Sequence, residues 1–281
     1  MFNLRQYDDG STGFENQADG KVLFRMNPNN SITYGGPVTG IIAGTHRYVD
    51  TVNGDDTKDG LSWDNAYATM EQALSVVQTY DHIHFVGDVR EELTATNLAF
   101  DVTIQGHGNR HRHPGWGTAP GSATWRPPAS PTATTPLLKV RAQGWRFIDI
   151  LFDCPIDSAA IYLERNALSG TSEFDAGHAE FYRCRFESGK WGIQNAGGCG
   201  FVGVYGCKFY RLTESGGAGI ICTSTSVAVP LNWEIFGNHF ANNASHILSS
   251  MSYSLIKNND FGRFTATLSI DIDDQPSANQ G

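Results

Sequence analysis

The sequence predicts an all-β protein that folds as a parallel β-helix of about seven coils, and three observations support this fold. Glycine provides 31 of the 281 residues, which is about 11% against roughly 7% in average proteins. Only 17% of residues are charged, against roughly 25% on average, and both values favour turn-rich β structure over helices. After residue 137, a strand pattern that ends in phenylalanine recurs at Phe152, Phe186, Phe209, Phe240 and Phe261.

The N-terminal segment, residues 1–46, is predicted to be an extended anchoring arm. It is rich in glycine and shows no sustained period of 2 or 3.6 residues, apart from one short strand at Lys21–Met26. Such a segment buries little surface by itself and does not offset its own ordering entropy. We therefore expect it to be ordered only against a partner.

A capping helix is predicted next, over about residues 66–80, with Asn65 or Asp64 as its N-cap. The apolar residues that recur at helical spacing are Met70, Ala73, Leu74 and Val77. The helix is expected to cover the open end of the first coil.

Two short strands follow at His82–Val89 and Asp101–Gln105, and then a Pro-rich insertion covers about residues 106–136. A long loop of this kind is usually functional or part of an interface. It contains Trp116 and Trp125, which we interpret as anchors of a subunit interface in preference to a platform for carbohydrate.

From Leu137 onward, alternate residues of each strand should share the inner face. The predicted inward sets are Ile148/Ile150/Phe152, Tyr182/Cys184/Phe186, Tyr205/Cys207/Phe209, Phe236/Asn238/Phe240 and Asn259/Phe261. Inward asparagines fit best near a corner, where the amide bonds to backbone or to another asparagine. Second strands are expected at Ala159–Leu163, Gly192–Gln194, Gly219–Cys222, His246–Leu248 and Thr267–Ile272. The β-helix should thus span residues 47–272, followed by a flexible tail at 273–281.

Charge and cysteine usage exclude some classes of partner. The net charge of −9 disfavours nucleic acid and anionic membrane surfaces, which attract a concentrated basic face. The first residues, MFNLRQYDDGSTGF, lack the basic and apolar regions of a signal peptide. The five cysteines are widely spaced without a CxxC pair, which favours reduced, buried thiols in a chain made in a cytoplasm.

One block of the sequence carries a family resemblance. The segment RYVDTVNGDDTKDGLSWDNAYATMEQAL, followed by DHIHFVGDV, resembles the opening coil and capping helix of right-handed parallel β-helix proteins of the pectate-lyase-like superfamily. The resemblance covers roughly residues 47–272 and implies the right-handed fold. It implies little about activity, because this scaffold carries lyases, hydrolases and wholly structural proteins.

A second resemblance concerns TIQGHGNRHRHPGW and ATWRPPASPTATTPLLKVRAQGWRFIDILFD. These segments look like β-helix proteins encoded by tailed bacteriophages, in which such chains are virion components. The resemblance implies a virion location after synthesis in the host cytoplasm. It also implies that the N-terminal arm anchors the chain to other virion proteins.

Candidate catalytic residues are Asp153, Glu187 and Asp149. Asp153 and Glu187 occupy the outward position after the phenylalanine on successive coils, and Asp149, four residues before Asp153, is expected on the same face. Glycoside hydrolysis uses two carboxyl groups, one as acid and one as base or nucleophile. The alternative is a solvated acidic stripe paired with Arg183 or Arg185, and we favour that interpretation.

Three basic or potentially basic residues, Arg185, Lys208 and His239, form a neighbouring outward column that we interpret as ordinary exposed residues.

No metal or cofactor site is favoured. The pairs His82/His84 and His111/His113 alternate as imidazole ligands would, but neither has a cysteine or carboxylate at diagnostic spacing. The segment DTVNGDDTKDG from Asp50 to Gly60 is rich in oxygen ligands but lacks the EF-hand pattern. Turn formation explains it adequately.

The sequence therefore predicts a non-enzymatic bacteriophage virion protein, either a capsid decoration or a short tail spike, assembled as a homotrimer. The alternative is a polysaccharide depolymerase, a glycoside hydrolase or lyase that acts on host surface glycans. The distance from His82 to Ile272 is short for a depolymerase groove, which favours the structural role.

Overall fold

The computed structural model describes residues 2–6, 12–16, 22–26, 32–34, 44–95, 99–108, 123–165, 176–196, 198–223, 230–262 and 270–274. The chain divides into two compact units, residues 1–43 and 44–281. The flexible tail was expected at 273–281, but residues 273 and 274 belong to the last strand, Ile270–Asp274, and residues 275–281 lie outside the described residues.

The N-terminal unit is a small antiparallel sheet. Its strands, in the order β1-β2-β3-β4, are β1 (Phe2–Gln6), β2 (Thr12–Asn16), β3 (Val22–Met26) and β4 (Ile32–Tyr34). The expectation of an extended arm with a single strand is therefore wrong. The sequence between the strands contains Asp-Gly and Asn-Pro pairs, which favour turns, and we interpreted them as an absence of structure.

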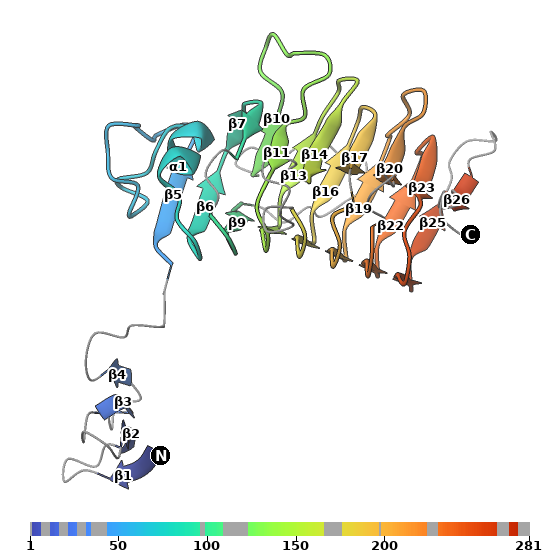
Figure 1. Ribbon diagram of the computed structural model, residues 1–281. Coiled ribbons are helices and arrows are strands. Elements are labelled where there is room, and N and C mark those ends of the chain that lie inside the picture. Colours follow the sequence, from blue (N-terminus) through green and yellow to red (C-terminus); the bar gives the residue numbers. More distant parts are fainter. Residues whose placement is uncertain are drawn as a thin grey trace. The chain divides into compact units, whose positions relative to one another are not determined.

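The second unit is a right-handed parallel β-helix made of three sheets, with coils that follow one another from β5 to β26 (Figure 1). Sheet 1 contains β5 (His46–Asp50), β6 (His82–Val86), β9 (Thr103–Gly106), β12 (Arg146–Ile148), β15 (Glu180–Tyr182), β18 (Gly203–Tyr205), β21 (Glu234–Phe236) and β24 (Leu255–Lys257). Sheet 2 contains β7 (Asp88–Arg90), β10 (Thr124–Arg126), β13 (Leu151–Asp153), β16 (Arg185–Glu187), β19 (Lys208–Tyr210), β22 (His239–Ala241) and β25 (Asp260–Gly262).

Sheet 3 contains β8 (Leu93–Thr94), β11 (Leu138–Val140), β14 (Ala159–Glu164), β17 (Trp191–Ala196), β20 (Ala218–Thr223), β23 (Ser245–Ser249) and β26 (Ile270–Asp274). The predicted second strands fall in β14, β17, β20 and β23, and the last one overlaps β26. The predicted fold class is confirmed.

Helix α1 (Met70–Val76) is shorter than the expected 66–80 and has Thr69 as its N-cap. The Thr69 hydroxyl accepts a hydrogen bond from the Gln72 amide at 3.1 Å. The chain before α1 has other partners, because Tyr67 forms a β-bridge with Val49. Within the described residues, no helix is long and apolar enough to cross a membrane.

Stacked aromatic rings fill the core beneath sheet 2. The ring centroids of Phe152, Phe186, Phe209, Phe240 and Phe261 follow one another at 5.1, 4.8, 4.6 and 5.2 Å. These distances match the separation of about 4.8 Å between neighbouring strands. The inward phenylalanine column predicted from the repeat is confirmed.

Trp125 extends this column, at 6.1 Å from Phe152. It lies on β10, within the expected insertion, and is 0% exposed. The expectation that Trp125 anchors an interface is therefore wrong, because its indole is part of the core. The repeat did not reveal this coil because its inward residue is tryptophan instead of phenylalanine.

At the corner between sheets 1 and 2, part of the predicted inward set is wrong. Ile148, Tyr182, Tyr205 and Phe236 lie outside the core and are half-buried or exposed. The residue after each one has a positive φ, with values of 56° at Asp149, 52° at Arg183, 61° at Gly206 and 67° at Gly237. A left-handed residue interrupts the alternation of a strand, so the side chains before and after it do not share a face.

The inner ladder behind this corner changes from cysteine to asparagine. Cys184 and Cys207 are buried, and their thiols contact backbone carbonyls. The Asn238 amide nitrogen donates to the Val204 carbonyl at 2.9 Å and to the Asn259 side-chain oxygen at 3.0 Å. The expected asparagine ladder is confirmed. All five cysteines of the chain are buried, and none of them forms a disulfide.

We predict that Phe209→Ala lowers the free energy of unfolding by about 3–5 kcal/mol, because it removes a fully buried ring from the middle of the stack. Phe201→Ala is the matched control, since Phe201 is 54% exposed, and it should change stability by less than about 0.5 kcal/mol. Chemical denaturation of the full chain measures both values. Equal losses of stability in the two variants would contradict the phenylalanine stack as the main contribution to the stability of the fold.

Candidate functional site

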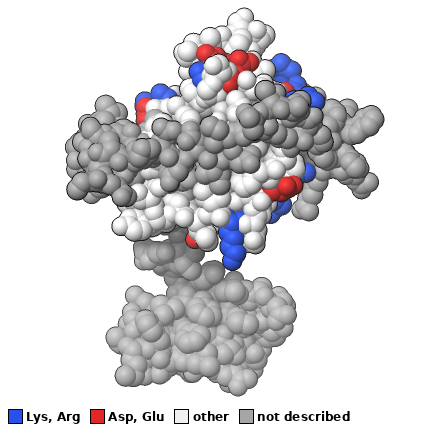
Figure 2. Space-filling view, turned by 90° about the vertical axis from the view of Figure 1, so that its right-hand side faces the viewer, with Lys and Arg blue, Asp and Glu red and all other residues white. Residues whose placement is uncertain are grey.

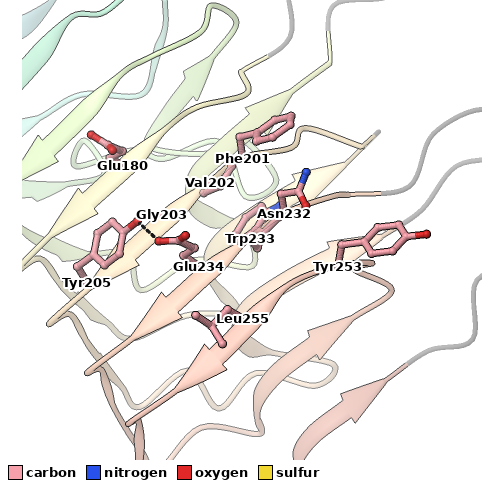
Figure 3. A pocket seen from close by; sticks show the side chains of 10 residues that line it. All are labelled: Glu180, Phe201, Val202, Gly203, Tyr205, Asn232, Trp233, Glu234, Tyr253 and Leu255. Carbon is pink, nitrogen blue, oxygen red and sulfur yellow. Dashed lines mark hydrogen bonds between the residues drawn. The ribbon is translucent and has the colours of Figure 1, made fainter.

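A groove of about 530 Å³ lies on the outer face of sheet 1, over the later coils (Figure 3). Its floor is formed by β15, β18, β21 and β24, and the ends of neighbouring turns form its rim. The residues that line it are Glu180, Phe201, Val202, Gly203, Tyr205, Asn232, Trp233, Glu234, Tyr253 and Leu255.

Two glutamates stand in one outward column of this groove. In the strand register, Glu180 pairs with Gly203, and Gly203 pairs with Glu234. The two glutamates are thus separated by two strand spacings, about 9.6 Å. Gly203 is required between them, because a Cβ atom there would lie 2.3 Å from the Tyr205 ring.

Tyr205 binds one of the glutamates. Its hydroxyl donates a hydrogen bond of 2.8 Å to Glu234 Oε2 (Figure 3), and its ring stacks on that of Tyr182 at 5.1 Å. Partial burial raises the pKa of Tyr205 well above its usual value, and the carboxylate of Glu234 raises it further. Tyr205 therefore keeps its proton over the ordinary pH range.

Glu180 has a cationic partner instead. The Arg146 guanidinium donates to Glu180 Oε2 at 2.7 Å from the neighbouring strand β12. Tyr182, two residues along β15, has a raised pKa, first because of partial burial and then because Glu180 lies nearby. The two glutamates of the groove therefore differ in environment, since a positive charge faces Glu180 and a neutral phenol faces Glu234.

The rim of the groove is apolar. Phe201, Tyr253 and Leu255 are 54%, 88% and 51% exposed, and the Phe201 ring lies parallel to His178 at 4.8 Å. Viewed toward the end of the β-helix that carries the last coils, the described surface is mostly uncharged, with acidic and basic side chains in small separate groups (Figure 2). Aromatic faces beside carboxylates suit ligands with apolar faces and many hydroxyl groups.

The carboxylates predicted from sequence lie on sheet 2 instead. Asp153 and Glu187 are register partners on β13 and β16. Arg126 lies 3.1 Å from Asp153, and Arg185 forms an ion pair with Glu187. Both side chains are thus neutralised by arginines on the same sheet, in agreement with the paired acidic stripe that we favoured.

Asp149 does not share a face with Asp153, contrary to expectation. It occupies the left-handed corner position and binds Arg183 through two hydrogen bonds of 2.8 Å. The expected basic column is formed by Arg185, Lys208 and His239 in register. The expectation that all three are exposed is wrong, because Arg185 is buried and bound to Glu187. His239 is itself 2.8 Å from Asp260.

The remaining candidates give no metal centre. Trp116, His111 and His113 lie outside the described residues. Among the residues that the structure does describe, no group of three or more His, Cys, Asp or Glu side chains could hold a metal ion. The carboxylates of Asp50, Asp55 and Asp59 each accept from the backbone amide two residues further on and so stabilise turns. Asp56 accepts from the amides of Ala68 and Thr69 and thereby holds this segment against the start of α1.

Sequence reasoning missed Glu180, Tyr205 and Glu234. The repeat contains a usable signal, because the three strands EFY, GVY and EIF align with Glu, Gly and Glu at the first position. We placed their last residues in the core, and so the outward column of sheet 1 was not considered.

Comparison with known proteins shows no matching family model and no matching curated protein. Among solved structures, a GH136 lacto-N-biosidase from Eubacterium ramulus aligns over 77% of this chain and 45% of its own, with 11% identity and a TM-score of 0.48. Its selenomethionine derivative gives 12% identity, 73% and 42% coverage, and a TM-score of 0.46. A rhamnogalacturonan lyase aligns over 71% of this chain and 69% of its own, with 12% identity and a TM-score of 0.35.

This chain thus spans less than half the length of the lacto-N-biosidase. Identities and TM-scores at this level give no function, and we therefore base the function on the groove itself.

We predict that Glu234→Gln lowers the pKa of Tyr205 toward the ordinary tyrosine value of about 10, because the variant removes the negative charge that favours the protonated phenol. An alkaline titration of tyrosine ring carbons by NMR measures the shift. Glu164→Gln is the control, since Glu164 acts on Tyr162 and should leave Tyr205 unchanged. An unchanged Tyr205 in Glu234→Gln would contradict the hydrogen bond.

Proposed function

We propose that this protein binds a polysaccharide chain in the groove of sheet 1 and hydrolyses it, with Glu180 and Glu234 as the two catalytic carboxyl groups. The single observation that carries the proposal is their arrangement on one face, two strands apart, with Gly203 between them. Carboxyl groups about 6.5–9.5 Å apart leave room for a water molecule opposite the leaving group. Two strand spacings, about 9.6 Å between the two backbones, lie close to the upper end of this range, and the arrangement therefore favours hydrolysis with inversion of the anomeric carbon.

The two glutamates have different environments, and this difference indicates which one acts as the general base and which as the general acid. Arg146 binds Glu180 through a charged hydrogen bond, which suits a carboxylate that orients and activates water. Glu234 is held by the neutral hydroxyl of Tyr205, on the other side of Gly203 in the same column. As part of the proposal we assign Glu180, which has the cationic partner, as the general base, and Glu234, which has the neutral partner, as the general acid.

Hydrolysis fits the groove better than elimination does. A lyase needs a basic group that accepts the proton next to a sugar carboxylate, and Tyr205, with its raised pKa, holds its proton. Two acidic side chains in the groove also repel anionic sugars. The rim residues Phe201 and Tyr253 offer aromatic faces, so uncharged glycans are the substrate class that the groove favours.

We predict that Glu180→Gln and Glu234→Gln each lower kcat by about 10²–10⁴-fold, because each variant removes one proton-transfer group. Binding should persist, since glutamine keeps the size and hydrogen-bonding ability of the side chain. A panel of neutral bacterial surface polysaccharides identifies the substrate by binding, and release of reducing ends measures cleavage. NMR of the first product should show the inverted anomer.

The matched control is the double variant Asp153→Asn and Glu187→Gln, which changes two carboxylates on sheet 2 that are paired with arginines. It should retain full activity. The proposal fails if this double variant abolishes cleavage while Glu180→Gln does not. It fails equally if no polysaccharide of the panel binds to the wild-type protein.

A second candidate function is the non-enzymatic bacteriophage virion protein, a capsid decoration or short tail spike assembled as a homotrimer. The observation that favours it is the separate compact unit at residues 1–43, which is suited to attach the β-helix to other virion proteins. In this role, surface glycans would be bound without being cleaved.

We predict for this second function that deletion of residues 1–43 leaves the β-helix folded but abolishes its incorporation into particles, because the deleted sheet makes the attachment. The double variant Glu180→Gln and Glu234→Gln should be incorporated at the normal copy number. Quantitative mass spectrometry of purified particles measures both. Full incorporation of the deleted chain would exclude anchoring by this unit.

A further inference from the structure

Three histidines form a continuous chain across the first coils, at the end of sheet 1 opposite to the groove strands. His46 lies on β5, His84 on β6, and His107 directly follows β9. His46 Nδ1 is 2.8 Å from His84 Nε2, and His84 Nδ1 is 2.9 Å from His107 Nε2. His84 therefore uses both ring nitrogens to connect its two neighbours.

The rings around this chain pack tightly on one another. The His46 and His84 rings are parallel within 4° at 5.1 Å, and His82 stacks on His46 at 5.0 Å. Tyr48 stacks on His84 at 5.2 Å, while Trp63 meets His107 edge-on. The chain is thus flanked by aromatic rings and by a fourth imidazole, while His46 at its end remains exposed.

Proton counting limits the charge that this chain can hold. Each N···N contact needs one proton and one lone pair, so the two contacts together hold two protons. If His84 takes up one additional proton, both contacts can be kept, because each of its two N–H groups then donates to a neutral neighbouring imidazole. A second additional proton places two N–H groups against each other, and one contact is lost.

The chain is also unsuited to chelation. His84 directs its two nitrogens toward different partners, so the three rings do not converge on one point. This agrees with the absence of a metal-binding group among the residues described.

The surroundings disfavour the charged forms. The pKa of His84 is lowered from 6.5 to about 4, first by burial and then by the neighbouring imidazoles of His107, His46 and His82. Burial also lowers the pKa of His82 and of His107.

The other charged groups that face the chain are few and only partly compensate. Arg146 on β12 opposes a charge on His82, while Asp81 favours one. Asp149 at the corner favours a charge on His107. Asp81 already forms an ion pair with Arg47 at 2.8 Å. Arg47 therefore compensates most of its negative charge, and little of it acts on the histidines.

We propose that the chain His46–His84–His107 is an acid-sensitive clasp, which holds the first coil on the β-helix at neutral pH and releases it in acid. β5 is the terminal strand of sheet 1 and pairs only with β6 within that sheet. Val49 on β5 covers the core next to Phe85, so release of the first coil exposes apolar surface.

The sign of the pH dependence follows from the depressed pKa. Well above pH 6.5, His82, His84 and His107 are neutral in both the closed and the released forms, and the clasp is fully stable. As pH falls from 6.5 toward 4, the released form takes up protons that the closed form excludes. Its population at pH 5 should rise about tenfold or more relative to pH 7.5, allowing for solvent screening of half-buried groups.

Hydrogen exchange of the full chain tests the clasp. Between pH 7.5 and pH 5, after correction for intrinsic exchange rates, protection of β5 and β6 should fall about tenfold or more, while β18 and β21 stay unchanged. In His84→Gln, which cannot take up a proton at this position, the acid-dependent loss of β5 protection should be several-fold smaller than in the wild type, because only His82 and His107 retain lowered pKa values. The control His178→Gln, on an exposed histidine stacked on Phe201, should keep the acid response.

A second measurement needs no variant. Nitrogen NMR of the wild-type imidazoles should show His84 titrating well below its ordinary pKa of about 6.5. The proposal is overturned if His84 titrates at or above 6.5. It is also overturned if β5 keeps its protection at pH 5, or if His84→Gln responds to acid as the wild type does.

Discussion

Stacking of each coil on the next is the interaction on which the rest of the structure depends. A single coil buries its inner face only against its neighbours, so every coil has to place a side chain of similar shape at the same position. The phenylalanine column from Phe152 to Phe261 meets this requirement, with centroid separations of 4.6–5.2 Å. These separations equal the strand spacing, and therefore ring contact and backbone pairing support the same register.

The regular spacing of the core also sets the geometry outside it. A left-handed residue at each corner, such as Asp149 or Gly206, separates sheet 1 from sheet 2 and directs the preceding side chain outward. Outward residues on successive strands consequently form straight columns with steps of about 4.8 Å. Glu180 and Glu234 are two steps apart, and their separation is a consequence of the phenylalanine stack.

Neighbouring charges decide what each column can do. On sheet 2, Asp153 and Glu187 are one step apart, but arginines neutralise both. On sheet 1, Glu180 alone has an arginine partner, while Glu234 has a neutral one. The same sheet carries the histidine chain on its first coils. The groove and the histidine chain therefore share one face but involve different coils and can be tested separately.

The sequence alone determined the β-helix, its phenylalanine column, most second strands and the asparagine ladder, because these depend on residues that recur along the chain. Glu180 and Glu234 were not found from the sequence. The assumption of strict alternation assigned Tyr182 and Tyr205 to the core, so the outward-facing column of sheet 1 was not considered. Trp125 was assigned to a surface because its coil lacks the repeating phenylalanine. Only the tertiary structure decided which residues face outward and which partners they have. The positive φ at each corner, the ion pair of Glu187 with Arg185 and the contacts of His84 depend on the local backbone conformation and on spatial neighbours. The spacing of residues along the sequence specifies neither of these.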